Sequence, residues 1–288
     1  MKLSGHTIPF AVFGHPIKHT LSPVMHNASI AALDMDAIYL AFDVHPDRLM
    51  ETLPAAAAMG FGGINLTVPL KEVAFRGIND LAESAKRLGA VNTVEFLENG
   101  LMKGHNTDGY GFVTAIKEAF QRSVKGLSVF ILGAGGAGRA IAITCACEGA
   151  GSIIVTDTKT DRSQQVAKEI NKMVPGILIQ TCPPVANDWI RCAAGSDMIV
   201  QATPTGMKRD DESLLPSTAF YKGQMVFDLV YMYPETKLMA VAHSAGAKTV
   251  NGLGMLLHQG AKAFNIWTGK QPAVEVMRKA LENEVYKK

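Results

Sequence analysis

Strand-like and helix-like hydrophobic patterns alternate along the first part of the chain. Residues 8–14 and 37–44 are predicted strands, because apolar, β-forming side chains run through both segments. Between them, residues 22–35 have helical spacing, with Ser22 as the expected N-cap and Pro23 at the first helical position. This alternation of strand and helix predicts an α/β sheet.

A lysine directly follows the next predicted strand. Ile64, Leu66 and Val68 alternate with polar residues as in a half-buried strand, Pro69 ends that strand, and Lys71 lies on the turn. Because the proline stiffens this turn, Lys71 is either a positioned proton donor or the charged end of a loop. Isolated lysines usually lie on the surface, and the spacing alone leaves both interpretations open.

Two further segments complete the first part of the chain. Residues 45–60 form a helical pattern that Pro54 is expected to kink or break. Residues 89–109 contain β-forming side chains on both sides of a turn at 98–100, which predicts a hairpin. This hairpin delivers the chain to Asp108.

After residue 109 the pattern restarts with a helix, an apolar strand and a glycine-rich loop. The loop consists of Gly133, Ala134, Gly135, Gly136, Ala137 and Gly138, and an alanine-rich helix follows it. Glycines allow a tight turn, the approach of a pyrophosphate to backbone N–H groups, and close packing of helix on strand. The next strand ends in Asp157, about 20 residues beyond the loop, as in dinucleotide-binding folds. This context predicts a Rossmann fold rather than a flexible turn.

The acid at the end of that strand bears on the choice of cofactor. The carboxylate of Asp157 is expected to accept hydrogen bonds from the ribose hydroxyls of NAD and to repel the phosphate of NADP. The sequence therefore predicts NAD in preference to NADP, with Thr158 and Lys159 also at the cofactor. Lys159 and Arg162 would offset part of the repulsion, or they belong to a solvated loop.

Later segments add candidates for the cofactor and substrate sites. Thr203 and Pro204 end a predicted strand, where ligands bind in a doubly wound sheet, although an ordinary turn explains them equally well. A glycine turn containing Gly252 and Met255 completes the predicted cofactor set. It opens a helix that carries Gln259 and is expected to return to the first domain.

Composition excludes several classes of function. A chain of 288 residues with 48% hydrophobic and 19% charged residues is globular, with about two domains. A net charge of +2 without a basic tract argues against a nucleic-acid partner. The cysteines (Cys145, Cys147, Cys182 and Cys192) form no C-x-x-C pair and have no His at ligand spacing, so no metal site and a reducing compartment are expected. No apolar run is long enough for a membrane span, and a cytoplasmic protein is predicted.

Seven segments together resemble the shikimate dehydrogenase family, including its quinate/shikimate dehydrogenase members. They are "HTLSPVMHN", "NLTVPLKE", "GAVNTV", "NTDGYGF", "GAGGAGRA", "DLVYMYPETKL" and "NGLGMLLHQGAKAF", and they span nearly the whole chain. The resemblance implies an N-terminal α/β substrate domain (1–108) completed by C-terminal helices (251–288). A Rossmann doubly wound dinucleotide-binding domain (109–250) lies between them in sequence.

The resemblance also implies an activity and a set of residues. Members interconvert shikimate and 3-dehydroshikimate, or quinate and 3-dehydroquinate, with NAD or NADP. Lys71 matches the catalytic lysine and Asp108 its acidic partner, because oxidation of an alcohol requires a group that takes the hydroxyl proton. The implied substrate-binding residues are Thr20, Ser22, Asn65, Thr67, Asn92, Tyr231 and Gln259. The expected partner is a small-molecule substrate, without nucleic acid or membrane, and the protein is expected to be a monomer or homodimer.

Two clues to the substrate disagree, and other functions compete. The family commonly has serine where this chain has Thr20, and the added methyl group would narrow the carboxylate end of the pocket, which favours shikimate. Asp157 favours NAD, which is commoner in members that also use quinate. A non-catalytic dinucleotide sensor and a folate-dependent dehydrogenase/cyclohydrolase are the alternatives. Lys71 and Asp108 disfavour the sensor, while Asp108 and the Thr20/Ser22 pair disfavour the folate enzyme.

Overall fold

The computed structural model describes residues 3–286, which form two compact units. Of these residues, the first unit comprises 3–111 and 256–286, and the second comprises Phe112–Met255. Each boundary lies three to five residues beyond the position expected from the sequence, within helix α5 (Asp108–Phe120) or helix α10 (Leu253–Thr268). Both helices are continuous, so no linker separates the units along the chain.

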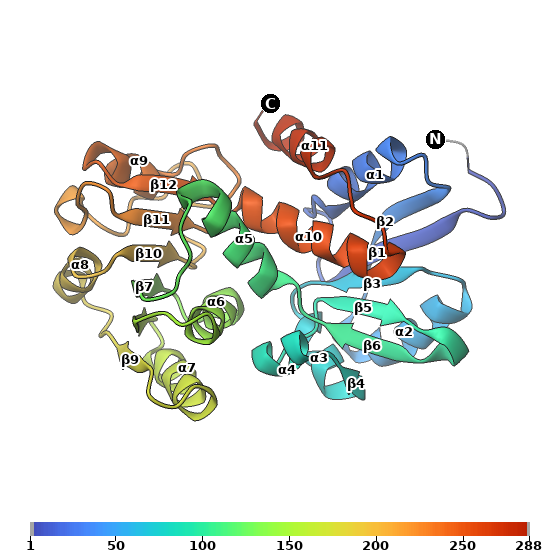
Figure 1. Cartoon of the computed structure of the whole chain (residues 1–288), viewed down its shortest axis with the longest axis horizontal. Helices are drawn as coiled ribbons and strands as arrows, with labels where there is room; N and C mark the ends of the chain where they lie inside the picture. The colour runs from blue at the N-terminus through green and yellow to red at the C-terminus, as the bar shows by residue number, and fades with distance from the viewer. Residues whose placement is uncertain (1–2, 287–288) are drawn as a thin grey trace. The chain divides into compact units, whose positions relative to one another are not determined.

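The first unit contains a six-stranded mixed sheet in the order β2-β1-β3-β5-β6-β4 (Figure 1). The strands are β1 (Ile8–Gly14), β2 (Ala37–Asp43), β3 (Gly63–Leu66), β4 (Asp80–Leu81), β5 (Thr93–Phe96) and β6 (Met102–His105). Strand β1 pairs in parallel with β2 and β3, whereas β5 pairs antiparallel with β3 and β6. The predicted hairpin is therefore confirmed, with a short 3-10 helix, η2 (Glu98–Gly100), at its turn.

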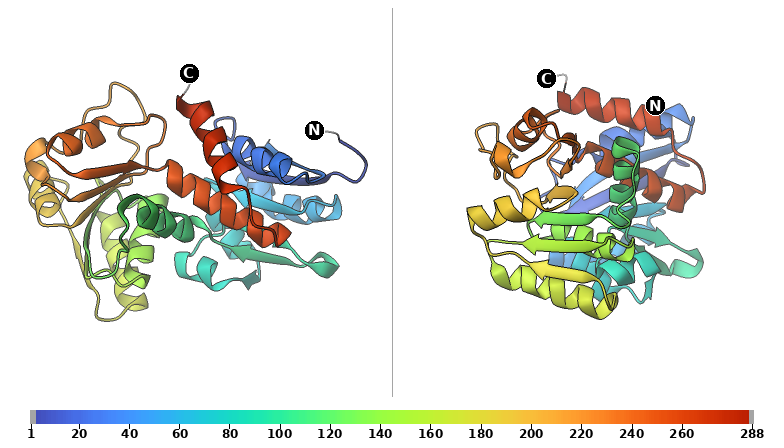
Figure 2. Two further views of the ribbon diagram at one scale, coloured as in Figure 1. Left: turned by 45° about the horizontal axis from the view of Figure 1, so that its top comes forward. Right: turned by 60° about the vertical axis from the view of Figure 1, so that its left-hand side comes forward.

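Helices cover both faces of this sheet. They are α1 (Ser22–Ala32), η1 (Pro46–Arg48), α2 (Leu49–Ala58), α3 (Leu70–Gly77), α4 (Glu83–Leu88), most of α10, and α11 (Val274–Tyr286). Side chains alternate between the two faces of a strand, so the sheet has a hydrophobic core on each face. Phe13 packs with Leu49 of α2 in one core, and Tyr39 packs with Phe264 of α10 in the other. Helix α11 lies alongside α1 (Figure 2).

Two local predictions in this unit are wrong. Strand β3 ends at Leu66, Val68 is 71% exposed, and Lys71 is the second residue of α3 rather than part of a turn. Of the two effects expected of Pro54, the break is wrong, because Pro54 lies inside α2 beside the buried side chain of Leu53. The kink stays a prediction. The placement of Lys71 in a helix limits the directions that its side chain can take.

The second unit contains a six-stranded parallel sheet in the order β12-β11-β10-β7-β8-β9. Its strands are β7 (Ser128–Leu132), β8 (Ser152–Thr156), β9 (Leu178–Thr181), β10 (Met198–Gln201), β11 (Met225–Asp228) and β12 (Lys248–Asn251). Its helices include α6 (Gly136–Cys147), α7 (Thr160–Met173), α8 (Ala186–Ala194), η3 (Ser217–Ala219) and α9 (Lys237–Ser244). The strand order reverses direction at β7, which is the doubly wound Rossmann arrangement, so the predicted α/β fold class is confirmed.

The parallel sheet is buried at its centre, as expected of a sheet covered on both faces. In β7, Val129, Phe130 and Ile131 are completely buried. Across residues 3–286, no helix is both long enough and apolar enough to span a membrane.

Candidate active site

Lys71 and Asp108 form a partly buried ion pair in the first unit. The Lys71 Nζ atom lies 2.7 Å from Oδ2 of Asp108, and the side chains are 27% and 15% exposed. The Lys71 carbonyl oxygen accepts a hydrogen bond from the Val91 N–H, and the Asp108 N–H donates to Oδ1 of Asn106. These backbone hydrogen bonds fix the two ends of the pair, which lie at the starts of α3 and α5.

Asn92 binds the other oxygen of the Asp108 carboxylate. Its Nδ2 donates to Oδ1 of Asp108 at 2.9 Å and to the Thr107 hydroxyl at 3.0 Å. Its Oδ1 accepts from the Thr107 N–H at 2.8 Å. A longer contact of 3.5 Å joins Nδ2 of Asn92 to Oε1 of Gln259 on α10. The structure therefore brings together four of the predicted residues of the first unit: Lys71, Asp108, Asn92 and Gln259.

Asn65 is also close to this group, but its side-chain amide already makes hydrogen bonds to other protein groups. Its Oδ1 accepts from the Tyr39 phenol at 2.7 Å, and its Nδ2 donates to the Asn92 carbonyl oxygen and the Thr93 hydroxyl. Asn65 is 5% exposed. The sequence did not single out Tyr39 or Thr93, because aromatic and β-branched residues at strand positions are ordinary core residues. It did not single out Thr107 either, because a threonine in the loop after a strand is an ordinary loop residue.

The predicted carboxylate-binding hydroxyl groups lie beside each other. Oγ1 of Thr20 is 3.3 Å from Oγ of Ser22, and the Ser22 N–H donates to Oγ1 of Thr20. The prediction that Ser22 caps the helix is wrong, because Leu21 is the N-cap of α1 and Ser22 the first helical residue. Thr67 follows β3 and packs over Gly14, where an added Cβ atom would lie 2.5 Å from Cγ2 of Thr67.

The glycines of the second unit have distinct structural roles. Gly133 has φ of +100°, and a Cβ atom there would lie 2.9 Å from the Ala202 carbonyl oxygen. A Cβ atom at Gly138 would lie 1.9 Å from the Gly133 carbonyl oxygen. At Gly135 and Gly136, by contrast, an added Cβ meets no protein atom within 4 Å. Open space at the N-terminus of α6 is the arrangement needed for a pyrophosphate to reach backbone N–H groups.

A cavity of about 380 Å³ opens at this loop. The predicted cofactor residues that line it are Gly133, Gly135, Gly136, Ala137, Asp157, Thr158, Thr203 and Pro204. Arg162 and Trp189 also line it, and Nε1 of Trp189 donates to the Thr156 hydroxyl at 2.9 Å. Trp189 was not predicted, because a tryptophan on an amphipathic helix is usually a core residue.

Other predicted residues of the second unit lie outside this lining. The predicted residues that do not line the cavity are Ala134, Gly138, Lys159, Gly252 and Met255. Gly252 has a packing role, since a Cβ atom there would lie 2.2 Å from the Leu229 carbonyl oxygen. Tyr231 follows β11, and burial raises the pKa of its phenol. Its predicted contact with the substrate stays a prediction.

Asp157 is tied to the backbone on both carboxylate oxygens. Oδ2 accepts from the Ala134 N–H at 2.8 Å, and Oδ1 accepts from the Lys159 N–H at 2.8 Å. The residue is only 9% exposed. Asp157 thus joins the glycine loop to the turn between β8 and α7, which is a structural role in addition to any contact with a cofactor.

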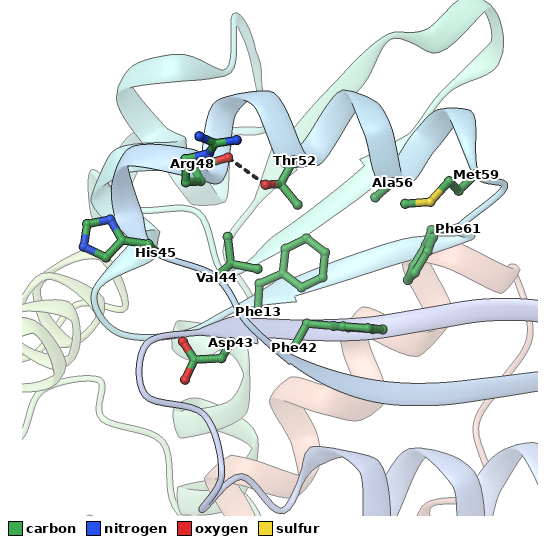
Figure 3. Close-up of a pocket in the computed structure, with 10 residues that line it drawn as sticks. All are labelled: Phe13, Phe42, Asp43, Val44, His45, Arg48, Thr52, Ala56, Met59 and Phe61. Atoms are coloured by element: carbon green, nitrogen blue, oxygen red, sulfur yellow. Dashed lines mark hydrogen bonds between the residues drawn. The ribbon is translucent and has the colours of Figure 1, made fainter.

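A separate groove of about 350 Å³ lies in the first unit, between α2 and the edge of the sheet. Its walls are mainly apolar, with the side chains of Phe13, Phe42 and Phe61 around it (Figure 3). Arg48 also lines it, and its guanidinium is paired with Glu51. None of the predicted catalytic or substrate-binding residues lines this groove.

Family models match two parts of the chain. Residues 12–94 match the shikimate dehydrogenase substrate binding domain, and residues 252–282 match the shikimate 5'-dehydrogenase C-terminal domain. The chain is 40% identical over 283 residues to a shikimate dehydrogenase (NADP(+)) of Methanopyrus kandleri, covering 98% of this chain and 97% of the relative. It is 43% identical over 278 residues to the Methanosarcina acetivorans protein of the same name, covering 94% and 96%.

Solved structures agree with these relatives. A shikimate dehydrogenase in complex with NADP+ has a TM-score of 0.89 at 35% identity, covering 99% of this chain and 98% of the other. The Listeria monocytogenes shikimate 5-dehydrogenase in complex with shikimate and NAD has a TM-score of 0.90 at 36% identity, with 98% of each chain covered. The Corynebacterium glutamicum quinate dehydrogenase in complex with NAD has a TM-score of 0.88 at 32% identity, covering 96% and 98%.

The predicted preference for NAD is wrong. Similar curated relatives are named as NADP(+)-dependent enzymes. The structure gives Asp157 a second role, because each of its carboxylate oxygens accepts a backbone hydrogen bond. A carboxylate held in this way acts as a clamp for the loop, and its presence at the end of β8 does not by itself identify the cofactor.

Proposed function

Because the chain belongs to the shikimate dehydrogenase family, we propose that it interconverts shikimate and 3-dehydroshikimate with NADP(H). The observation that carries this proposal is the Lys71–Asp108 pair, at 2.7 Å, within a group of hydroxyl and amide side chains. A dinucleotide sensor has no use for such a pair. The family membership also disfavours a folate-dependent enzyme.

Lys71 exchanges the proton of the reacting hydroxyl group. Oxidation of a secondary alcohol removes a hydride from carbon and a proton from oxygen, and NADP+, when bound, supplies the hydride acceptor. The Lys71 amine takes the proton, and the Asp108 carboxylate orients that amine through Oδ2. Asn92 in turn holds the carboxylate through Oδ1. The two oxygens of Asp108 thereby have separate positioning roles.

The substrate contacts follow from hydrogen-bonding capacity. Thr20 and Ser22 bind the substrate carboxylate through their hydroxyl groups, and Tyr231 contributes its phenol. Thr67 and Gln259 bind ring hydroxyls, which both donate and accept. The Nδ2 groups of Asn65 and Asn92 already donate to protein acceptors, so these two residues shape the site as well as line it.

The second unit has the features that an NADP molecule needs. The open positions at Gly135 and Gly136 give the pyrophosphate access to the N-terminus of α6. The Arg162 guanidinium lines the same cavity and supplies the positive charge for the 2′-phosphate. Arg162→Ala is expected to weaken NADP binding about tenfold or more while NAD binding changes little. Equal losses for both cofactors, in a fluorescence titration, would contradict this assignment.

Quinate is the second candidate substrate, because a quinate dehydrogenase has a similar structure. Quinate has an additional hydroxyl at the carbon that bears the carboxylate, and we expect the Thr20 methyl group to leave less space for it. Initial rates of NADP and NAD reduction with shikimate and with quinate test the proposal. We expect the fastest turnover with shikimate and NADP, and we expect Thr20→Ser to raise the relative rate with quinate. No turnover of shikimate with either cofactor would overturn the proposed function.

We also propose the partners, location and oligomeric state that are expected from the sequence. Its partners are the small-molecule substrate and cofactor, it works in the cytoplasm, and it is a monomer or homodimer. Sedimentation equilibrium distinguishes the two oligomeric states.

A further inference from the structure

A buried tyrosine lies at one end of a continuous chain of polar groups in the first unit. Tyr39 is on β2 and is 1% exposed. Its phenol reaches past β1 to Asn65 on β3, with a distance of 2.7 Å between the phenol oxygen and Oδ1 of Asn65. The contact therefore spans three strands of the sheet, and all of its members lie in one unit.

The phenol is held in place by groups around it. The side-chain amide of Asn27 bonds to both the N–H and the carbonyl oxygen of Tyr39, each at 2.8 Å. The His26 ring stacks on the phenol ring with a centroid distance of 4.1 Å and an angle of 4°. Burial raises the pKa of Tyr39 well above its usual value, so the phenol keeps its proton and remains a donor.

The orientation of Asn65 follows from its neighbours. The Asn92 carbonyl oxygen only accepts hydrogen bonds, so Nδ2 of Asn65 faces it at 3.0 Å. Oδ1 of Asn65 therefore points toward Tyr39, which donates to it. Without the phenol hydroxyl, the buried Oδ1 of Asn65 would lack a hydrogen-bond donor, and an unpaired buried acceptor destabilises the folded state.

The orientation of Asn92 is fixed in the same way. The Thr107 N–H only donates, so Oδ1 of Asn92 faces it, and Nδ2 faces the Asp108 carboxylate. The Thr93 hydroxyl connects the two amides, since it accepts from Nδ2 of Asn65 and donates to Oδ1 of Asn92. The chain of polar groups thus runs from Tyr39 to the oxygen of Asp108 that Lys71 does not bind.

Tyr39, Asn65, Thr93 and Asn92 are all buried, so water does not compete for the hydrogen bonds that join Tyr39 to Asp108.

We propose that Tyr39 is a positioning residue for the Lys71–Asp108 pair and acts on it through the buried side chains of Asn65, Thr93 and Asn92. This inference rests on the proposed function for its catalytic consequence. The hydroxyl of Tyr39 touches neither the reacting atoms nor Asp108, and it acts by holding Asn65. The coupling of the polar groups is a property of the protein without any ligand.

Tyr39→Phe removes the hydroxyl and leaves the stacked ring. We expect kcat for shikimate to fall about tenfold and KM for shikimate to rise, with the dissociation constant for NADP unchanged. In ligand-free protein, the side-chain amide NMR signals of Asn65 and Asn92 should both shift. Tyr221→Phe is the matched control, because its phenol donates to the Ser196 carbonyl oxygen in the second unit. That variant should change neither kcat nor these amide signals.

Thr93 provides a second test should Tyr39→Phe fold poorly. Thr93→Val removes the next hydroxyl in the chain and should lower kcat and shift the Asn92 amide signals, whereas Thr93→Ser should restore both. Wild-type kcat together with unshifted Asn92 signals in Tyr39→Phe, or in folded Thr93→Val, would overturn the proposal. A wild-type protein that does not oxidise shikimate would instead refute the proposed function, and the amide signals would still decide whether the polar groups are coupled.

Discussion

The Nζ atom of Lys71 lies 2.7 Å from Oδ2 of Asp108, and neither side chain is fully exposed. Surface pairs between long side chains contribute little, but this pair is held by backbone hydrogen bonds and by Asn92. The lysine amine is therefore presented in one place, as a group that exchanges a proton with a bound substrate must be.

Replacing Asp108 tests the role of its charge. Asp108→Asn keeps the shape of the side chain but removes the negative charge that orients Lys71. We expect kcat to fall about 100-fold or more, with a smaller change in KM, in steady-state assays with shikimate. Asp80→Asn is the control, because Asp80 forms a looser pair with Lys103 at 4.0 Å in the same unit. A kcat within about twofold of wild type for Asp108→Asn would contradict the assignment.

Two glycines of the cofactor loop should respond differently to alanine. An added Cβ at Gly138 collides with the Gly133 carbonyl oxygen, so Gly138→Ala should lower the free energy of unfolding by about 2 kcal/mol or more. Gly135 has φ of −68° and open space around it, so Gly135→Ala should fold normally but weaken NADP binding. Urea denaturation and cofactor titration measure the two effects. The opposite pattern would show that the roles of the two glycines are misassigned.

His26 should make the protein sensitive to acid. Burial lowers the pKa of His26 from 6.5 to about 3, and neither ring nitrogen has a hydrogen-bond partner among residues 3–286. The folded state disfavours protonation of His26. The stability that the neutral His26 ring contributes is therefore fully present above pH 6.5 and is lost as the pH falls toward 3. This loss amounts to about 3 kcal/mol by pH 4.5.

His26→Leu should remove this part of the acid sensitivity. Urea denaturation at neutral pH and at about pH 4.5 measures it as a difference in unfolding free energy. His243→Leu is the matched control, because the His243 side chain is 73% exposed. An identical loss of stability in wild type and His26→Leu would show that His26 does not cause it.

Asp228 should have the opposite dependence on pH. Burial raises the pKa of Asp228 from 3.8 to about 6, although Thr236 and Val230 donate hydrogen bonds to its carboxylate. The folded state favours the protonated form, so this contribution is present below pH 3.8 and is lost as the pH rises toward 6, by about 3 kcal/mol in total.

Asp228→Asn removes the titrating group at almost the same size. As the pH rises from 3.8 to 6, the unfolding free energy of wild type should fall relative to that of Asp228→Asn. A difference that stays constant across this range would contradict the raised pKa.

The arrangement of elements could be predicted from the sequence where the pattern was strong. The apolar run in β7, followed by the glycine loop and Asp157, gave the second sheet correctly. The hairpin of β5 and β6 was also predicted, because β-forming residues lie on both sides of a turn. Lys71 was misplaced onto a turn, since the proline before it is compatible with both a turn and the start of a helix.

The hydrogen bonds of the site could not be predicted in the same way. Tyr39 and Asn65 are 26 residues apart and meet only because β1 lies between their strands. The two bonds of Asp157 to the Ala134 and Lys159 N–H groups depend on the folded loop. A sequence identifies an acid at the end of a strand, but the groups that its oxygens bind are set by tertiary structure.

The most direct test of the account is the steady-state rate of shikimate oxidation with NADP, measured side by side for wild type, Lys71→Ala and Lys103→Ala. We predict turnover by wild type and Lys103→Ala, and a kcat at least about 1,000-fold lower for Lys71→Ala, with an unchanged dissociation constant for NADP. A Lys71→Ala protein that turns over shikimate at close to the wild-type rate would contradict the assignment of Lys71 as the group that exchanges the proton.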